Sequence, residues 1–173
     1  PSLQFIAARG GLGTQIRDQA NTIVANLGQQ TNAMYKTLYV PENLSYESYE
    51  AIRNEPVIQE VTNLYNDVQI VIHGIGDAQQ MAQRRKSSPE TLNLLKERHA
   101  TSEAFGYYFN ADGEIVHQIA SIGIQLEQVK KADHVIAVAA GKSKAKAIQA
   151  YLKNGLPQTT LITDEETADT ILN

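Results

Sequence analysis

The chain has 173 residues, enough for one domain with a sizeable core and too few for two comfortable ones, so we expect a single domain over residues 1–173. Hydrophobic residues make up 42% and charged residues 20%, which is typical of a folded chain, and the net charge of −4 argues against a free-standing nucleic-acid-binding protein. The absence of cysteine excludes disulfides, cysteine zinc sites and thiol nucleophiles and fits a cytoplasmic protein, while no membrane span or signal peptide is expected.

The N-terminal residues predict a strand, a glycine loop and a helix. Residues 3–8 read as a buried strand, which is followed by the loop Arg9–Gly13. Thr14 can cap the helix, which is expected to end near Gly28. The apolar residues of this helix recur at three- and four-residue spacing: Ile16, Ala20, Ile23, Val24 and Leu27.

A second strand and two helices follow. Residues 36–40 predict a short strand that stops at Pro41. Helices are expected over residues 46–53 and 56–66, and the second carries proline in its first turn, where a missing N–H costs nothing. The residues that predict the inner face of the second helix are Val57, Val61 and Leu64.

The stretch from Ile70 to Arg85 carries the strongest pattern in the chain. A strand over residues 68–72 runs into His73, the backbone turns through two glycines, and a helix opens with Asp77. A strand, a glycine turn and a helix start form an arrangement that holds anions, because helix N-termini carry partial positive charge. Arginine adds a fork of donors that matches phosphate. This stretch therefore predicts binding of a phosphorylated small molecule.

The middle of the chain predicts a helix and a hairpin. The helix covers residues 89–98 and is capped by Ser87 or Ser88. Residues 105–110 are aromatic, and residues 114–119 alternate between polar and apolar, with the turn dipeptide Asp112-Gly113 between them. These two segments predict an antiparallel hairpin inserted into a chain that otherwise forms a parallel sheet.

The C-terminal part returns to strands and helices. A short helix is expected over residues 125–131 and a strand over 134–139, after which Ala140–Lys144 opens a helix. Residues 159–163 predict another strand, and Asp164 caps the last helix. The inner face of the helix that follows Lys144 is predicted from Ala145, Ile148 and Leu152.

The repeated strand–loop–helix units predict an α/β fold: a Rossmann-like, mainly parallel sheet with helices on both faces and an inserted antiparallel hairpin. In such sheets ligands bind beyond the C-terminal ends of the strands. Arg9, His73, the Arg84 helix and Lys144 are therefore expected to gather there.

Two of the candidate anion sites each allow a second interpretation. The glycines of the Arg9–Gly13 loop permit close approach to a ligand, but they also suit a tight turn with a solvated arginine. Gln19 could offer an amide to the same space or lie on the surface. Arg84 and Arg85 could bind a ligand or lie at a solvated helix end, where arginine complements the helix dipole. They differ by about 100° around a helix, so at most one is expected to face a ligand, and spacing does not choose between them.

The segment Gly141–Lys144 resembles part of a phosphate-binding P-loop, but the first glycine of that motif would fall on Ile136. What remains is a helix start with two lysines and a serine cap, which suits a phosphate without implying its hydrolysis. A capped helix with surface lysines is the alternative.

Glu103 and the aromatic run after it are candidates for sugar binding, because carboxylates accept sugar hydroxyls beside aromatic faces. An aromatic strand in the core is the alternative. The four histidines show no metal-ligand spacing, and no Ser/His/Asp arrangement is readable, so neither a metal site nor a bound cofactor is predicted.

With these loops identified, the sequence resembles the C-terminal effector-binding domain of bacterial SorC-family transcription regulators. The similarity covers nearly the whole chain in order, and the blocks MAQRR and EAFGYYFNADG are specific. The matching blocks are ARGGLG at Ala8–Gly13, QAN at Gln19–Asn21, HGIG at His73–Gly76, MAQRR at Met81–Arg85, EAFGYYFNADGE at Glu103–Glu114 and SKAKAI at Ser143–Ile148.

The resemblance implies a non-enzymatic sensor of glycolytic phosphosugars, chiefly fructose 1,6-bisphosphate. It also implies control of a DNA-binding domain and of the oligomeric state, a homodimer or tetramer, of a repressor of glycolytic genes, with no membrane partner. Arg9 and Lys144 would hold phosphate, Gln19 would support them, Arg84 is preferred over Arg85 for the second phosphate, and Glu103 would take sugar hydroxyls. The full set of implied effector-binding residues is Arg9, Gly10, Gly11, Gln19, Arg84, Glu103, Tyr107, Phe109 and Lys144.

The family's helix-turn-helix region and its earlier strand with a Gly-Gly-Thr-Thr type phosphate loop are absent from these residues, and Ala140 stands where relatives can carry glycine. The family fold resembles phosphosugar isomerases and deaminases, so such an enzyme is the alternative function. It would need a general base, for which His73 and Glu103 are the candidates.

Overall fold

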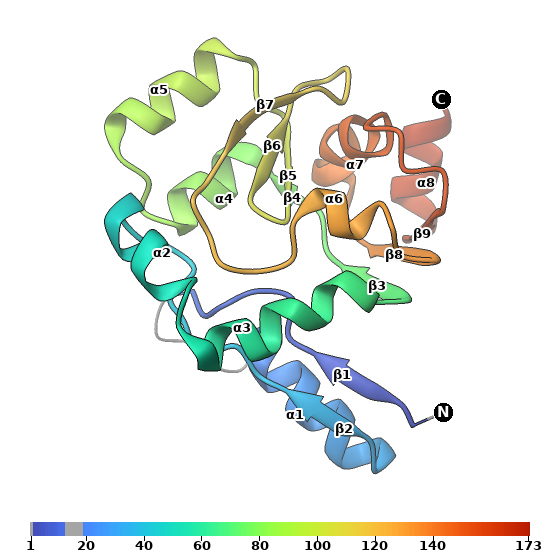
Figure 1. The fold of residues 1–173 in the computed structure, drawn as a ribbon. Coiled ribbons are helices and arrows are strands. Elements are labelled where there is room, and N and C mark those ends of the chain that lie inside the picture. Colours follow the sequence, from blue (N-terminus) through green and yellow to red (C-terminus); the bar gives the residue numbers. More distant parts are fainter. Residues whose placement is uncertain (1, 13–18) are drawn as a thin grey trace. The chain divides into compact units, whose positions relative to one another are not determined.

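The computed structural model describes residues 2–12 and 19–173, which form two compact units (Figure 1). The first unit comprises residues 2–12, 19–68 and 120–128, and the second comprises residues 69–119 and 129–173. The expectation of a single domain stays a prediction. None of the helices in the described ranges is long and apolar enough to span a membrane.

The first unit is built on a pair of parallel strands with helix α1 beside them (Figure 1). Gln4 lies opposite Met34 in the register of this pair. Helix α1 ends where Asn32 adopts a left-handed conformation with φ of 53°. The elements of this unit are β1 (Gln4–Ile6), α1 (Ala20–Thr31), β2 (Met34–Lys36), α2 (Tyr46–Ile52), α3 (Pro56–Thr62) and the 3₁₀ helix η1 (Asn63–Asp67).

Strand β2 lies earlier than the predicted strand over residues 36–40. The Asn21 side chain explains the difference, because its Oδ1 accepts from the Leu38 N–H at 2.7 Å and its Nδ2 donates to the Leu38 carbonyl at 2.9 Å. The Leu38 main chain is therefore bonded to a helix side chain and not to a neighbouring strand. Leu38 and Val40 remain buried, as their hydrophobicity predicts.

The helices α1 and α3 of this unit differ in two details from the predicted helices. The predicted cap Thr14 lies outside the described residues, and α1 begins at Ala20 after an extended Gln19. Val57 is 70% exposed, so its predicted inner position is wrong. With Pro56 at the start of α3, the face that packs inward passes through Ile58 and Val61.

The second unit contains a parallel sheet of strand order β3-β8-β9. Asp164 caps α8 by accepting from the Thr167 N–H, as the sequence predicts. The predicted inward positions of Ala145 and Ile148 in α7 are confirmed, but that of Leu152 is wrong. Three- and six-residue steps from Ala145 lead to Ile148 and Tyr151, which are buried. The elements are β3 (Ile70–His73), β8 (His134–Val138), the 3₁₀ helix η2 (Lys142–Lys144), α7 (Ala145–Leu152), β9 (Thr159–Ile162) and α8 (Glu165–Leu172). The short helix α6 (Leu126–Val129) begins in the first unit and ends at the first residue of the second.

The second unit also contains an antiparallel sheet of order β4-β5-β6-β7, against which helix α4 packs (Figure 1). The predicted hairpin is confirmed as β6-β7, and two unpredicted strands extend it. Asp77 and Ser88 cap α4 and α5 through their side chains. The elements are β4 (Gly76–Asp77), α4 (Ala78–Arg84), α5 (Pro89–Glu97), β5 (Ser102–Ala104), β6 (Tyr107–Phe109) and β7 (Ile115–Gln118). The mixed α/β class with a parallel sheet and an antiparallel excursion is confirmed.

Candidate functional site

The glycine loop after β1 packs tightly against residues 40–42 of its own unit. A Cβ at Gly10 would lie 2.2 Å from the Val40 carbonyl oxygen. The Gly11 N–H donates to that same oxygen at 2.8 Å, and the Glu42 N–H donates to the Gly11 carbonyl at 2.8 Å. The glycine at position 10 is therefore required by backbone packing, whether or not a ligand also approaches the loop.

The Arg9 guanidinium is largely buried beside two side chains of its own unit. Its Nη2 donates to Ser121 Oγ at 2.7 Å and to Glu42 Oε1 at 3.4 Å. The Arg9 side chain is 16% exposed and that of Glu42 is 8% exposed. The cation predicted to hold phosphate thus lies next to an internal carboxylate.

Gln19 lies at the same loop, and its predicted support of the phosphate site stays a prediction. Its Nε2 donates to the Leu12 carbonyl at 3.2 Å. A Cβ at Gly11 would lie 2.8 Å from Gln19 Oε1. The structure therefore brings the Gln19 amide to the loop that contains Arg9, Gly10 and Gly11.

In the second unit the two adjacent arginines have different surroundings. Arg84 is exposed, whereas Arg85 is buried. Arg85 Nη2 donates to Glu103 Oε1 at 2.9 Å and Nη1 donates to the Tyr108 hydroxyl at 3.0 Å. Arg84 is thus the arginine of the pair whose side chain is accessible to a ligand, and its preference for the second phosphate stays a prediction.

Glu103 is 5% exposed and holds a tight turn in addition to the ion pair. Its Oε1 accepts from the Gly106 N–H at 2.7 Å. Phe105 and Gly106, which connect β5 to β6, both have positive φ, 57° and 82°. A two-residue turn with two positive φ values matches the twist of a hairpin. The predicted contact of Glu103 with sugar hydroxyls stays a prediction, and its observed role is to join α4, β5 and this turn.

The aromatic strand β6 is buried. Tyr107 is 8% exposed, and Phe109, with no exposed surface, packs edge-on against Tyr151 with 5.8 Å between ring centroids. These positions favour the interpretation of the aromatic run as core. Their predicted role in lining the effector site stays a prediction.

The loop before α7 is held by a carboxylate from the start of α8. The Gly141 N–H donates to Asp164 Oδ2 at 2.9 Å and to Thr167 Oγ1 at 2.8 Å. The pKa of Asp164 is lowered below its ordinary value, mainly by the hydrogen bond from the Thr167 N–H and also by the Thr167 hydroxyl. Lys144 is the N-cap residue of α7, and it makes no side-chain cap bond. The predicted serine cap is wrong, because Ser143 lies inside η2, while the phosphate role of Lys144 stays a prediction.

His73 is half-buried in an aromatic cluster of the second unit. Its ring lies 4.4 Å from that of Phe105, its Nδ1 lies 2.8 Å from the Gly74 carbonyl, and its Nε2 lies 3.0 Å from the Tyr151 hydroxyl. A carbonyl oxygen only accepts, so Nδ1 carries the proton and Tyr151 donates to Nε2. Burial lowers the pKa of His73 to about 4. The imidazole is therefore neutral at pH 7, and both its nitrogens are engaged.

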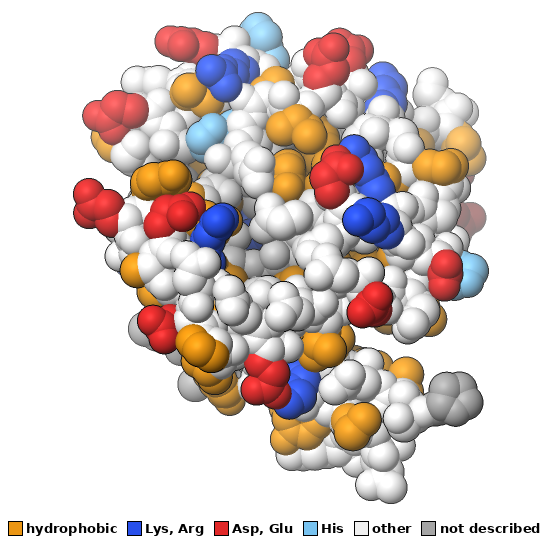
Figure 2. Space-filling view, in the orientation of Figure 1, with side chains coloured by type: hydrophobic (Ala, Val, Ile, Leu, Met, Phe, Trp, Pro, Cys, Tyr) orange, Lys and Arg blue, Asp and Glu red, His pale blue; other side chains and the backbone are white. Residues whose placement is uncertain are grey.

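Sequence reasoning missed Glu42 and Ser121. Ser121 stands 112 positions after Arg9, so no local pattern connects them. Among the described residues no group of three or more potential ligands could hold a metal ion. On the face shown in Figure 2, basic and acidic side chains are interspersed, without a broad basic patch among the residues drawn there.

Comparison with known proteins identifies the family. The model of the sugar-binding domain family, Sugar-bind, matches residues 1–173. A solved structure of a SorC-family transcriptional regulator from Enterococcus faecalis is 46% identical, with a TM-score of 0.89 over 98% of this chain and 69% of that one. The chain therefore belongs to the sugar-binding domain family of SorC-type regulators.

Two curated relatives are named central glycolytic genes regulator. The Bacillus subtilis protein is 46% identical over 98% of this chain and 50% of its own length, and the Priestia megaterium protein is 47% identical over 97% and 49%. This chain thus spans about half the length of the curated relatives it matches. The full-length sorbitol operon regulator SorC of Klebsiella pneumoniae, at 19% identity and a TM-score of 0.87, shares the fold.

Proposed function

We propose that this chain is the effector-binding domain of a repressor of glycolytic genes and that it binds phosphorylated sugars such as fructose 1,6-bisphosphate. The observation that carries the proposal is the 46% identity to the Bacillus subtilis central glycolytic genes regulator over 98% of this chain. Binding of the sugar would shift the equilibrium of the longer protein between conformations that differ in DNA binding and in homo-oligomerisation. A ligand shifts such an equilibrium only by its differential affinity for the two states.

The cations assigned to phosphate support this proposal within each unit. In the first unit, Arg9 lies in the loop after β1, which the Gln19 amide also contacts. A guanidinium can make charge-assisted hydrogen bonds to a phosphoryl group. In the second unit, Lys144 stands at the N-terminus of α7 and Arg84 in the last turn of α4. Each of these cations can bind a phosphoryl group.

The surroundings of the candidate bases favour a binding role over an enzymatic one. His73 is neutral, but its Nε2 already accepts from Tyr151, so it has no lone pair directed at a substrate. Glu103 is engaged by Arg85 and by the Gly106 N–H. A general base needs an accessible lone pair within reach of the proton it removes.

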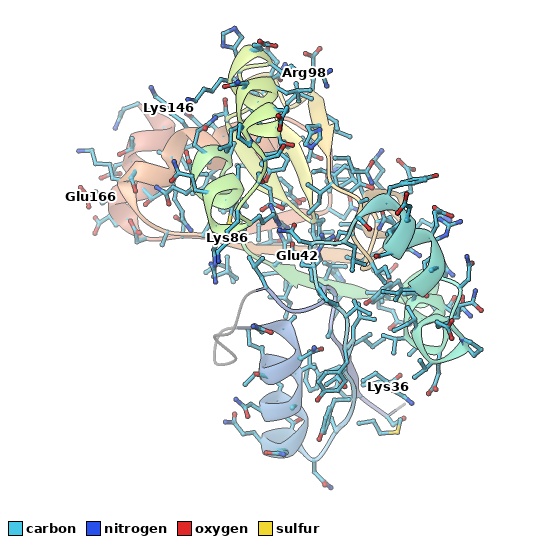
Figure 3. All side chains as sticks on the ribbon, turned by 90° about the vertical axis from the view of Figure 1, so that its left-hand side faces the viewer. Lys36, Glu42, Lys86, Arg98, Lys146 and Glu166 are labelled. Atoms are coloured by element: carbon cyan, nitrogen blue, oxygen red, sulfur yellow. The ribbon has the colours of Figure 1, made fainter. Side chains whose placement is uncertain are left out.

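Isothermal titration of the chain with fructose 1,6-bisphosphate, fructose 6-phosphate and inorganic phosphate tests the proposal. The bisphosphate is expected to bind most tightly, and a hundredfold excess over its Kd should stabilise the fold by about 2.7 kcal/mol in a parallel melting experiment. Lys144→Ala should weaken binding. Lys146→Ala, two positions along the chain and pointing outward from α7 (Figure 3), is the matched control and should not.

Absence of binding by every phosphosugar would contradict the proposal for this chain. Conversion of fructose 6-phosphate to another sugar phosphate by the purified chain would establish the isomerase function in its place, and release of ammonia from an amino-sugar phosphate would establish the deaminase function.

A further inference from the structure

We propose that Glu42 acts as an internal competitor for the Arg9 guanidinium, so that an incoming phosphoryl group must displace its carboxylate. Glu42 would thereby set how strongly anionic a ligand must be in order to bind. This inference rests on the proposed function for the assignment of Arg9 to phosphate, and it concerns contacts within the first unit alone.

The contact between Arg9 and Glu42 is longer than that of a well-formed ion pair. Arg9 Nη2 lies 3.4 Å from Glu42 Oε1 but 2.7 Å from Ser121 Oγ. Charge-assisted N–H···O bonds are usually about 2.7–2.9 Å long. The same nitrogen therefore makes its short bond to a neutral hydroxyl and only a long one to the carboxylate. A phosphoryl oxygen at ordinary bonding distance would improve on that contact.

Because Arg9 and Glu42 are largely buried, the anion that pairs with Arg9 strongly affects its electrostatic energy. The two side chains are 16% and 8% exposed, so their charges are only partly screened by water. A negative charge that stays near Arg9 opposes the arrival of a second one, because Coulomb interactions strengthen where water is excluded. A dianionic phosphate gains more from Arg9 than a singly charged carboxylate ligand does, so it is better able to displace the Glu42 carboxylate.

The backbone keeps Glu42 at this place. Its N–H donates to the Gly11 carbonyl at 2.8 Å, and the Gly11 N–H donates to the Val40 carbonyl at 2.8 Å. Gly11 and Pro41 form an isolated parallel bridge. The loop after β2, where Figure 3 labels Glu42, is therefore joined to the loop that carries Arg9. Displacement of the carboxylate requires rotation of its side chain and not movement of either loop.

The substitution Glu42→Gln tests the proposal because it removes the charge and retains the shape. Isothermal titration of the chain with fructose 1,6-bisphosphate and with inorganic phosphate should show affinity higher than wild type by about fivefold or more. Affinity for acetate should rise as well, because acetate must displace the same carboxylate. Glu60→Gln is the matched control, since Glu60 is an exposed carboxylate of the same unit that pairs with Lys36, and it should leave these affinities unchanged.

Unchanged or weaker phosphate binding by folded Glu42→Gln would overturn the proposal and would identify Glu42 as a residue that positions Arg9. Should Glu42→Gln fail to fold by circular dichroism, Glu42→Asp retains the charge on a shorter side chain. Phosphate affinity of Glu42→Asp above wild type supports displacement, and affinity equal to or below it overturns it.

The two proposals fail in different ways. If the wild-type chain binds phosphosugars and Glu42→Gln binds them no more tightly, the proposed competition by Glu42 is refuted and the proposed sugar-sensing function stands. If the wild-type chain binds no phosphosugar or phosphate but Glu42→Gln binds phosphate, competition by Glu42 is supported and sugar sensing by the wild-type chain is refuted. Absence of phosphate binding by both proteins refutes the competitor as well.

Discussion

Arg85 and Glu103 form an ion pair almost completely shielded from water, with 2.9 Å between Nη2 and Oε1 and side chains that are 3% and 6% exposed. Arg85 stands at the C-terminal end of α4, and Glu103 lies in β5, so the pair connects a helix to the antiparallel sheet. The Tyr108 hydroxyl accepts from Arg85, and the Gly106 N–H donates to Glu103. Loss of Glu103 would remove a buried carboxylate that pairs with Arg85.

Glu103→Gln is therefore expected to lower the free energy of unfolding by about 3–5 kcal/mol, because the buried Arg85–Glu103 ion pair is broken. Urea denaturation followed by circular dichroism measures the change. Glu60→Gln, which breaks the exposed pair with Lys36, is the control and should have little effect. Equal effects of the two substitutions would show that the Arg85–Glu103 pair contributes no more than a surface contact.

The stability of the chain should decrease as the pH falls, partly because of His73. Burial lowers the pKa of His73 in the folded state to about 4, whereas an exposed histidine titrates near 6.5. Between these two values the unfolded chain binds a proton that the folded chain does not. The contribution is present above pH 6.5 and is lost as the pH falls, by about 2 kcal/mol between pH 7.5 and pH 5.

Urea denaturation at these two pH values, with the variant His73→Gln beside the wild type, measures this contribution. The variant loses the ring contact with Phe105 and is expected to be less stable at both pH values, but its pH dependence should be much weaker. A smaller slope should remain, because burial and Arg98 also hold the pKa of His117 below its ordinary value. An NMR titration that places the pKa of His73 near 6.5 would contradict this account.

Much of the fold could be predicted from local signals in the sequence. Asp77, Ser88 and Asp164 each stand where a polar side chain caps a helix, and each does so in the structure. The hairpin β6-β7 follows from the aromatic run and the Asp112-Gly113 turn. Strands β4 and β5 could not be predicted, because two or three residues are too few to show an alternating pattern.

The candidate site could be predicted less completely, because its contacts join residues far apart in the chain. The sequence allows the Gln19 amide to reach the space beside Arg9, but no pattern connects Arg9 with Ser121. The sequence alone does not show which of the adjacent residues Arg84 and Arg85 is buried. The structure distinguishes them, since Arg85 reaches Glu103 and Arg84 is exposed.

Gly113 and Gly155 should respond differently to alanine although their backbones are alike. Their φ values are 81° and 86°, so alanine at either position should cost about 1–2 kcal/mol from backbone strain alone. A Cβ at Gly113 would also lie 2.5 Å from the Lys153 carbonyl carbon, whereas a Cβ at Gly155 has no atom within 4 Å. Gly113→Ala should thus be the more destabilising by a further 1–3 kcal/mol or so in urea denaturation. Equal losses would mean that the turn at Gly113 moves away from Lys153 at little cost.

A similar comparison decides why the loop after Arg9 contains glycine. A Cβ at Gly10 would lie 2.2 Å from the Val40 carbonyl oxygen, but a Cβ at Gly74 would have its nearest neighbour, the Val138 carbonyl oxygen, at 3.8 Å. Gly10→Ala should destabilise the chain by roughly 1–3 kcal/mol, because the two loops must separate. Gly74→Ala should be neutral or slightly stabilising, since alanine restricts the unfolded chain.

Urea denaturation and titration with fructose 1,6-bisphosphate, carried out on both variants, separate packing from ligand approach. Gly10→Ala with wild-type stability and lost binding would mean that the glycine serves the ligand and that the loop does not pack as described. Reduced stability with binding that recovers when the folded fraction is taken into account would mean that Gly10 serves the backbone contact with Val40. The second result is expected, because the overlap at Gly10 is with main-chain atoms, which cannot rotate away as a side chain can.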